Sequence, residues 1–115
     1  MSGRLIYHLA RHADFERAAA SAHYAGARED TADGFMHFST AGQVAESAAR
    51  HRSGEPDLIL LAVDPDRLGA ALRWEPARGG ELFPHLYGAL PLSAVVWTKP
   101  LPLGPDGRHS FPPEL

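Results

Sequence analysis

The sequence predicts an α+β fold with a small, mostly antiparallel or split β-sheet core flanked by two main helices. Several apolar segments have the length of short strands, only two longer segments carry helix signals, and the two kinds do not alternate regularly as βαβ units would. A chain of 115 residues leaves room for one hydrophobic core. We therefore expect a single domain over residues 1–115, ending in a Pro/Gly-rich tail at 99–115.

Strand signals begin at residues 5–10, where Ile6 and His8 would share one face and Tyr7 and Leu9 the other. The continuous apolar run at 57–63 predicts a central strand buried on both faces. Shorter strands are expected at 35–39, 72–75 and 92–98.

Helix signals are strongest after Thr40, because Thr40 and Gln43 match the capping box. A helix is expected over 41–52, burying Val44, Ala45 and Ala48. An earlier helix is predicted to start at the cap Asp14 and to end near Gly26.

The connecting segments carry turn signals. The polar segment 28–34 ends in Asp33-Gly34, which is a strong turn signal. Asp64 and Pro65 predict a single helical turn. Pro84 and Gly88 favour ordered loop over much of 81–88, and the tail is expected to wrap the surface.

Composition excludes several functions. The chain has no cysteine, so disulfides, thiolate metal sites and cysteine nucleophiles are impossible. A net charge of −3 with evenly spread basic residues argues against a nucleic-acid surface, although a nucleic acid stays open as an acceptor. No signal-peptide pattern occurs, and no run of about 18 apolar residues. We expect a cytoplasmic protein that does not bind membranes.

Histidine is the residue type most suggestive of chemistry. Four of the seven histidines are expected to be solvated surface residues: His12, His23, His51 and His109. The other three lie within apolar segments: His8, His37 and His85. Any one of these is better explained as a hydrogen-bonded core residue. Burying all three without a role would require repeated desolvation, and this favours a shared cleft.

Aromatic and polar residues accompany these histidines. Phe35, His37 and Ser39 would share a strand face, and Phe83, His85 and Tyr87 repeat the pattern. The aromatic rings could equally belong to the core.

Carboxylates follow the same segments. Glu81 is either a general base or a surface charge, and Asp33 is better explained as a turn residue.

Three stretches together resemble a known family: residues 6–9, 33–40 and 81–88, with 90–92 beside them. They are similar to the bacterial and plant family catalogued as domain of unknown function 952, over about 5–98. That family looks like a compact relative of the ADP-ribosyltransferases, which use NAD.

The resemblance implies roles for particular residues. His8 would orient the ribose, His37 with Ser39 and Thr40 would form the second motif, and Glu81 or His85 would supply the third. Tyr87 or Phe35 would form an aromatic wall for the nicotinamide. The third motif departs from the acidic pattern of the well-studied transferases, because it is dominated by Phe83, Pro84 and His85.

Three functions follow from these observations. The leading one is an ADP-ribosyltransferase-like enzyme that binds NAD or a similar small nucleotide-type ligand, with His37, His85 and Glu81 as catalytic residues and no metal. The second is a non-catalytic ligand-binding or interaction module. The third is a metal-dependent hydrolase in which His8, His37 and His85 hold the ion.

Overall fold

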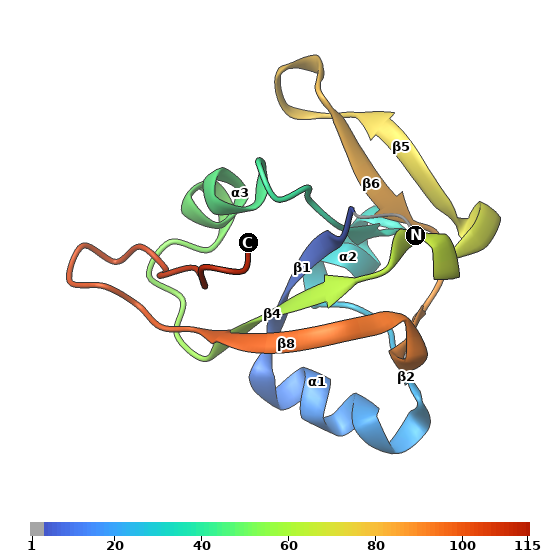
Figure 1. The fold of residues 1–115 in the computed structure, drawn as a ribbon, viewed down its shortest axis with the longest axis horizontal. Helices are drawn as coiled ribbons and strands as arrows, with labels where there is room; N and C mark the ends of the chain where they lie inside the picture. Colours follow the sequence, from blue (N-terminus) through green and yellow to red (C-terminus); the bar gives the residue numbers. More distant parts are fainter. Residues whose placement is uncertain (1–3) are drawn as a thin grey trace.

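The computed structural model describes residues 4–115, and within them the strands form three small antiparallel sheets (Figure 1). The α-helices and strands run in the order β1 (Ile6–Arg11), α1 (His12–Ala18), β2 (His23–Tyr24), α2 (Arg28–Asp33), β3 (Met36–His37), α3 (Val44–His51), β4 (Leu58–Val63), β5 (Leu72–Pro76), β6 (Leu82–Leu86), β7 (Leu90–Pro91) and β8 (Val95–Leu101). This confirms the predicted α+β class with a split antiparallel core.

The first sheet has the order β1-β4-β8, and every residue of its central strand β4 is buried. Alternate residues of β4 enter two separate apolar clusters, one on each face of the sheet. Leu61 packs into one cluster and Leu60 into the other. The predicted central strand buried on both faces is confirmed.

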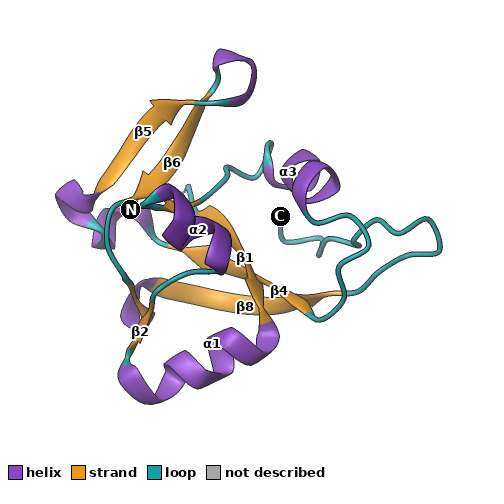
Figure 2. Cartoon of the chain, turned by 180° about the vertical axis from the view of Figure 1, so that it is seen from behind, coloured by secondary structure: helices purple, strands orange, loops and turns teal. Residues whose placement is uncertain are grey.

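Different elements cover the two faces (Figure 2). Phe15 of α1, Tyr24 of β2 and Leu86 of β6 pack into the cluster on one face. On the other face, Val44 of α3 and Phe111 of the tail join the second cluster. The expectation that the tail wraps the surface is therefore confirmed.

One prediction for the tail, that for His109, is wrong. His109 was expected to be solvated, but it is half-buried, and its Nε2 donates a hydrogen bond of 2.7 Å to the carbonyl oxygen of Glu55.

The second three-stranded sheet has the order β3-β6-β5, with β6 at its centre. Residues 81–88 were predicted to be mostly loop, and this is wrong, because Leu82–Leu86 form a strand. Pro84 is tolerated because its carbonyl accepts from the Phe38 N–H at 3.0 Å. The nitrogen of Pro84 faces the same side, just past the end of β3, so its missing N–H removes only the reciprocal bond to Phe38 at the end of the ladder.

The helices differ from expectation in their limits. The first helix was predicted to continue to near Gly26, but α1 ends at Ala18. Its N-cap is Arg11, and the predicted cap Asp14 lies inside the first turn. The polar segment 28–34 was given no helix, but Arg28–Asp33 form α2, a helix too short to show periodicity, and the predicted turn residue Gly34 ends it with a φ of 85°.

The observed limits of α3, β8 and β3 also differ from the predicted ones. Half of the capping box forms, since the Thr40 N–H donates to Gln43 Oε1 at 3.0 Å, but α3 begins only at Val44 and Ala45 is exposed. The strand predicted at 92–98 begins at Val95 and continues to Leu101. The strand predicted at 35–39 is shortened to two residues, β3.

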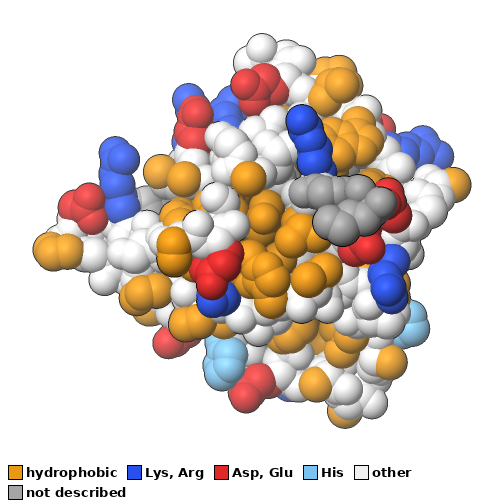
Figure 3. All heavy atoms as spheres, viewed as in Figure 1, with side chains coloured by type: hydrophobic (Ala, Val, Ile, Leu, Met, Phe, Trp, Pro, Cys, Tyr) orange, Lys and Arg blue, Asp and Glu red, His pale blue; other side chains and the backbone are white. Residues whose placement is uncertain are grey.

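Apolar side chains also reach the surface. Figure 3, in the orientation of Figure 1, shows hydrophobic side chains gathered near the centre of one face. Val96 of β8 is 55% exposed and Leu82 of β6 is 53% exposed.

Within residues 4–115, no helix combines the length and the apolar character required to cross a membrane.

Candidate functional site

A cavity of about 480 Å³ lies where the first sheet meets α2, α3 and the second sheet. His8, His37, His85 and Ser39 are among the residues that line it. The expectation that these three histidines, distant along the chain, share one pocket is therefore confirmed.

Strand pairing explains the convergence. His37 of β3 pairs directly with His85 of β6, so both side chains lie on the same face with ring centroids 5.9 Å apart. His8 arrives from β1, which exchanges two backbone hydrogen bonds of 2.8 Å between Tyr7 and Ser39. These two bonds join the sheets beside the pocket.

His8 is 2% exposed, and its Nδ1 lies 2.7 Å from the carbonyl oxygen of His37. Since a carbonyl only accepts, Nδ1 carries the proton. Burial lowers the pKa of His8, against the opposing effect of Asp30, so the ring is neutral near pH 7. Its Nε2, buried and without a hydrogen bond in residues 4–115, lies 3.8 Å from Asp30 Oδ2.

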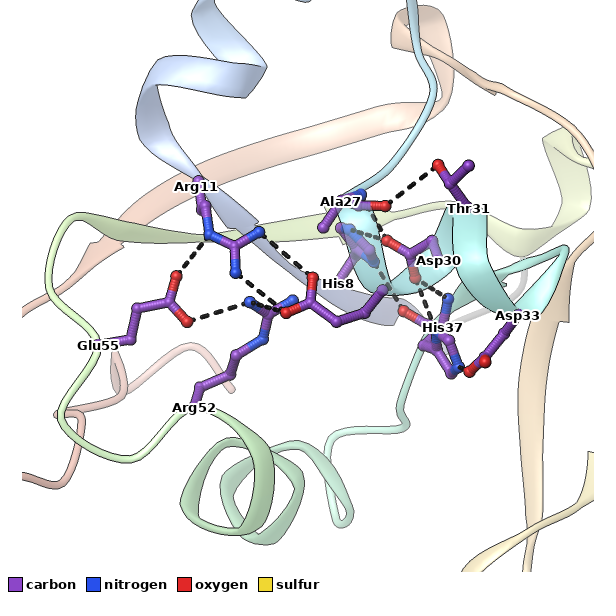
Figure 4. Close-up of polar contacts among 10 residues, drawn as sticks. His8, Arg11, Ala27, Asp30, Thr31, Asp33, His37, Arg52 and Glu55 are labelled. Carbon is purple, nitrogen blue, oxygen red and sulfur yellow. Dashed lines mark hydrogen bonds and ion pairs between the residues drawn. The ribbon is translucent and has the colours of Figure 1, made fainter.

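His37 lies between two carboxylates (Figure 4). Its Nδ1 is 2.6 Å from Asp30 Oδ1 and its Nε2 is 2.8 Å from Asp33 Oδ2. The hydrogen bond to Asp30 is the main reason that the pKa of His37 is raised, and Asp33 adds to it. His37 is therefore favoured as an imidazolium whose two N–H groups are both already bonded.

Asp30 of α2 organises this part of the site. Its side chain is nearly buried and accepts backbone hydrogen bonds from Ala27 at 2.6 Å and His37 at 2.8 Å. Burial alone would raise the pKa of Asp30, but the hydrogen bonds from His37, His8 nearby and the backbone donors together lower it to about 2. Sequence reasoning missed Asp30, and an acidic residue early in a short helix was the available signal.

Glu75 of β5 is a second functional residue that sequence reasoning missed. Glu75 Oε1 lies 2.8 Å from His85 Nδ1 and accepts the Tyr87 hydroxyl at 2.7 Å. The hydrogen bond from His85 is the first cause of the lowered pKa of Glu75, and Glu75 in turn raises the pKa of Tyr87. Only the register of β5 against β6 brings these residues together.

The remaining predicted site residues lie outside the lining of the cavity. Phe35 stacks on His85 from behind, with ring centroids 4.1 Å apart, and also contacts Tyr87. Thr40 takes part in the turn before α3. These residues support the site without forming its wall.

Glu81 lies at the exposed tip of the β5–β6 hairpin, where Gly79 and Gly80 turn the chain. Gln43 Nε2 donates to Glu81 Oε1 at 3.1 Å and to the Leu82 carbonyl at 3.0 Å. These contacts join the hairpin tip to the start of α3 instead of directing Glu81 at the histidines.

The cavity has walls of opposite charge. The acidic wall comes from α2: Glu29, Asp30 and Asp33. The basic wall comes from the residue after α3 and from the hairpin tip, Arg52 and Arg78, and His51 of α3 also lines the cavity.

The cations of the basic wall differ in how firmly they are already paired. Arg52 is nearly buried and donates to Glu55 Oε1 at 3.1 Å, in a network that includes Arg11 and Glu29. Arg78 lies over the Phe83 ring at 5.0 Å, and its only carboxylate contact in residues 4–115 is Glu46 at 3.5 Å. Arg78 is thus the cation most available to a ligand.

The histidines do not form a metal-ligand cluster. Across the part of the chain that the structure describes, no three His, Asp or Glu side chains are arranged to share one metal ion. The three-histidine metal alternative therefore has no geometric support in these residues.

The fold and the cavity define a small α+β domain with a histidine-lined, charge-divided pocket. Comparison with known families is specific: the model of the family described as "Protein of unknown function (DUF952)" matches residues 9–98. The chain belongs to this family.

Solved structures agree with that assignment. The crystal structure of protein CC0527 from Caulobacter crescentus is 42% identical, with 92% of this chain and 93% of that chain covered and a TM-score of 0.89. The solution NMR structure of CC0527 gives 42% identity, 90% coverage of each chain and a TM-score of 0.80. The search of curated proteins gives no match. These comparisons support the family and the fold, but not the expected resemblance to ADP-ribosyltransferases.

Proposed function

We propose that the pocket binds a nucleotide-type ligand, with NAD as the first candidate, and that the site transfers its ADP-ribosyl group to an acceptor. The observation that carries this proposal is the meeting of the three predicted imidazoles, His8, His37 and His85, in one cavity whose lining also carries carboxylates and guanidinium groups. Such a set of convergent polar groups is typical of a ligand site and uncommon in a packed core.

The size of the cavity supports a nucleotide. Small-molecule pockets commonly measure roughly 300–1,000 Å³, and this one measures about 480 Å³. That volume suits one base–ribose–phosphate unit, so the second half of a dinucleotide would extend past the rim.

The division of charge supports the nicotinamide half of oxidised NAD. Its pyridinium ring is positive and its phosphate is negative, which matches a lining that carries both carboxylates and guanidinium groups. Asp33 would face the ring with Oδ1, because its Oδ2 is the atom held by His37, and Arg78 would bind the phosphate through charge-assisted hydrogen bonds. A ribose hydroxyl that reaches the floor of the cavity would give His8 Nε2 the donor that it lacks.

The same walls suit cleavage of the nicotinamide–ribose bond. Positive charge develops on the ribose as the bond breaks, much as in glycoside hydrolysis. Carboxylates fixed beside that carbon stabilise the charge without reorganising. The α2 wall supplies them, in place of Glu81, which lies outside the cavity.

Binding is tested by calorimetry and thermal shift with NAD, nicotinamide mononucleotide, ADP-ribose and AMP. We expect NAD and nicotinamide mononucleotide to bind, and Arg78→Ala or Asp33→Asn to weaken them by roughly tenfold. His23→Ala, at an exposed position on β2 away from the cavity, is the control. No binding by any of the four at millimolar concentration would overturn the proposal.

A non-catalytic ligand-binding module is the second candidate. One observation favours it: both ring nitrogens of His37 are already bonded to carboxylates, so His37 has no free group for proton transfer. Ligand binding without release of nicotinamide during prolonged incubation would select this second function.

A further inference from the structure

The geometry points to His85 as the group that accepts the proton of the attacking acceptor, with Glu75 and Tyr87 as positioning residues that hold its ring. This inference rests on the proposed transfer reaction and names the residues that carry its proton. The acceptor belongs to the class of water or hydroxyl groups.

Strand register builds the arrangement. Glu75 of β5 pairs with Phe83 of β6, and His85 lies two residues further along β6 on the same face. This diagonal neighbour position is within reach of a glutamate side chain. Tyr87 continues the same face and reaches the same carboxylate oxygen.

The hydrogen bond fixes which nitrogen of His85 carries the proton. Glu75 is a carboxylate and can only accept, so His85 Nδ1 donates across the 2.8 Å contact. In the neutral ring, Nε2 then has a lone pair. Within residues 4–115, Nε2 makes no hydrogen bond, yet it is not among the fully buried unpaired atoms. Since the ring lines the cavity, this lone pair is available to a bound acceptor.

The ring is also held rigidly. His85 is 7% exposed, and Phe35 stacks on it with an interplanar angle of 27°. Glu75 is itself fixed by the Tyr87 hydroxyl at 2.7 Å, and the Arg73 guanidinium lies 5.1 Å from the centre of the Tyr87 ring. An oriented base within hydrogen-bond reach is what general base catalysis requires.

Of the pocket histidines that come from the strands, neither of the other two offers the same group. His8 Nε2 is fully buried and lies against Asp30. His37 has both nitrogens bonded to Asp30 and Asp33. His85 is thus the one of these three whose free nitrogen meets the cavity, and the fourth histidine of the lining, His51, is exposed and has no hydrogen bond among residues 4–115 to orient its ring.

The step balances as follows. The bond between ribose C1′ and the pyridinium nitrogen breaks, and its electron pair neutralises the ring to give nicotinamide. The acceptor oxygen forms a new bond to C1′ and loses its proton to His85 Nε2. His85 then releases that proton to solvent from the open side of the cavity.

The first test needs no substrate. Long-range ¹H–¹⁵N NMR of the imidazoles, with His85 assigned by its loss in His85→Gln, should show the Nδ1–H form in the wild type. Glu75→Ala should return the ring to the Nε2–H form that neutral imidazole prefers in water, and Tyr87→Phe should leave the Nδ1–H form in place. An Nε2–H ring in the wild type would overturn the inference.

The second test is kinetic, with nicotinamide release from NAD as the signal. His85→Gln should lower kcat by about 100-fold and Glu75→Ala by about 10-fold, with KM changed less than about threefold. Glu16→Gln on α1, an exposed carboxylate outside the cavity, is the matched control. Thermal unfolding of each variant verifies that it is folded.

The two proposals fail in different ways. If NAD neither binds nor reacts, the proposed function fails, and the role of His85 as a base fails with it. If wild type turns over and His85→Gln retains full kcat, the base is not His85 although the transfer stands. A loss confined to KM would also overturn the inference, because it would make His85 a binding residue only.

Discussion

The two three-stranded sheets of this molecule use their side chains differently. In β1-β4-β8, both faces of the central strand enter apolar clusters. In β3-β6-β5, one face packs Met36 and Leu86 into the core, whereas the other presents His37 and His85 to a cavity. The first sheet thus buries side chains on both faces, and the second keeps polar side chains of one face at the cavity.

The difference lies in what the central strand tolerates. β4 has no polar side chain and no proline, while β6 contains Pro84 and His85 beside short partners. Because β3 is short, the chain leaves the second sheet early, and the cavity occupies the space beyond the end of β3. Substitutions in the two sheets should therefore have separable effects on stability and on binding.

The largest effect is expected at the centre of the first sheet. Leu60→Ala removes a fully buried side chain from β4, and should lower the free energy of unfolding by about 2–5 kcal/mol. Urea denaturation followed by circular dichroism measures it. A loss below about 1 kcal/mol would contradict the view that this sheet carries the core.

The next largest effect is expected at Asp30, which links α2 to the second sheet. Asp30→Asn should lower the free energy of unfolding by about 2–3 kcal/mol. The charged carboxylate accepts from three donors, whereas the amide offers a neutral oxygen and an NH₂ group that faces other donors. The control is Asp33→Asn, whose side chain is 57% exposed and whose loss should change stability little. Equal losses in both variants would break the distinction.

Acid should weaken the same contacts between Asp30 and the second sheet. The pKa of Asp30 is held at about 2, below its ordinary value of 3.8, so its stabilisation is present above pH 3.8 and is lost as pH falls toward 2. Over this range the free energy of unfolding of the wild type should fall by roughly 2 kcal/mol more than that of Asp30→Asn. Urea unfolding at pH 4, 3 and 2 compares the two proteins, and parallel curves would show that Asp30 is not the titrating group.

A smaller effect is expected on the cavity face of the second sheet. His85→Gln should change stability by less than about 1 kcal/mol, because Glu75 is 33% exposed on its side chain and can be hydrated when it loses its partner. Differential scanning calorimetry gives the comparison. A loss above about 2 kcal/mol would mean that His85 is chiefly a structural residue.

The smallest effect is expected at the surface of β8. Val96→Thr alters a side chain that is 55% exposed and should change the free energy of unfolding by at most about 0.5 kcal/mol. The same urea series measures it. A larger loss would indicate that the surface apolar residues contribute to the core.

The sequence was sufficient for the first sheet because its signals are local. Alternation in β1 and the continuous apolar run in β4 depend only on neighbouring residues, and Asp64 caps a turn as predicted, accepting from the Asp66 N–H. Local signals also placed His8 and His37 in strands, whereas His85 was assigned to a segment expected to be mostly loop. What remained undetermined was how the strands pair.

The parts that could not be predicted depend on register or on very short elements. Glu75 reaches His85 only because β5 and β6 align as they do. Asp30 sits in a six-residue helix, whose polar composition looks like a turn. Pro84 argued against a strand, and only the early end of β3 makes it acceptable.

The exposed contacts at the hairpin tip determine how easily the tip, which brings Arg78 to the cavity, moves relative to α3. Gln43 and Arg78 hold the tip against α3 through solvent-exposed polar contacts, each worth little in water. Parting them requires no rupture of the apolar clusters on either face of β4. Movement of the tip should therefore occur on the timescale of a surface loop, far faster than global unfolding and almost independent of core stability.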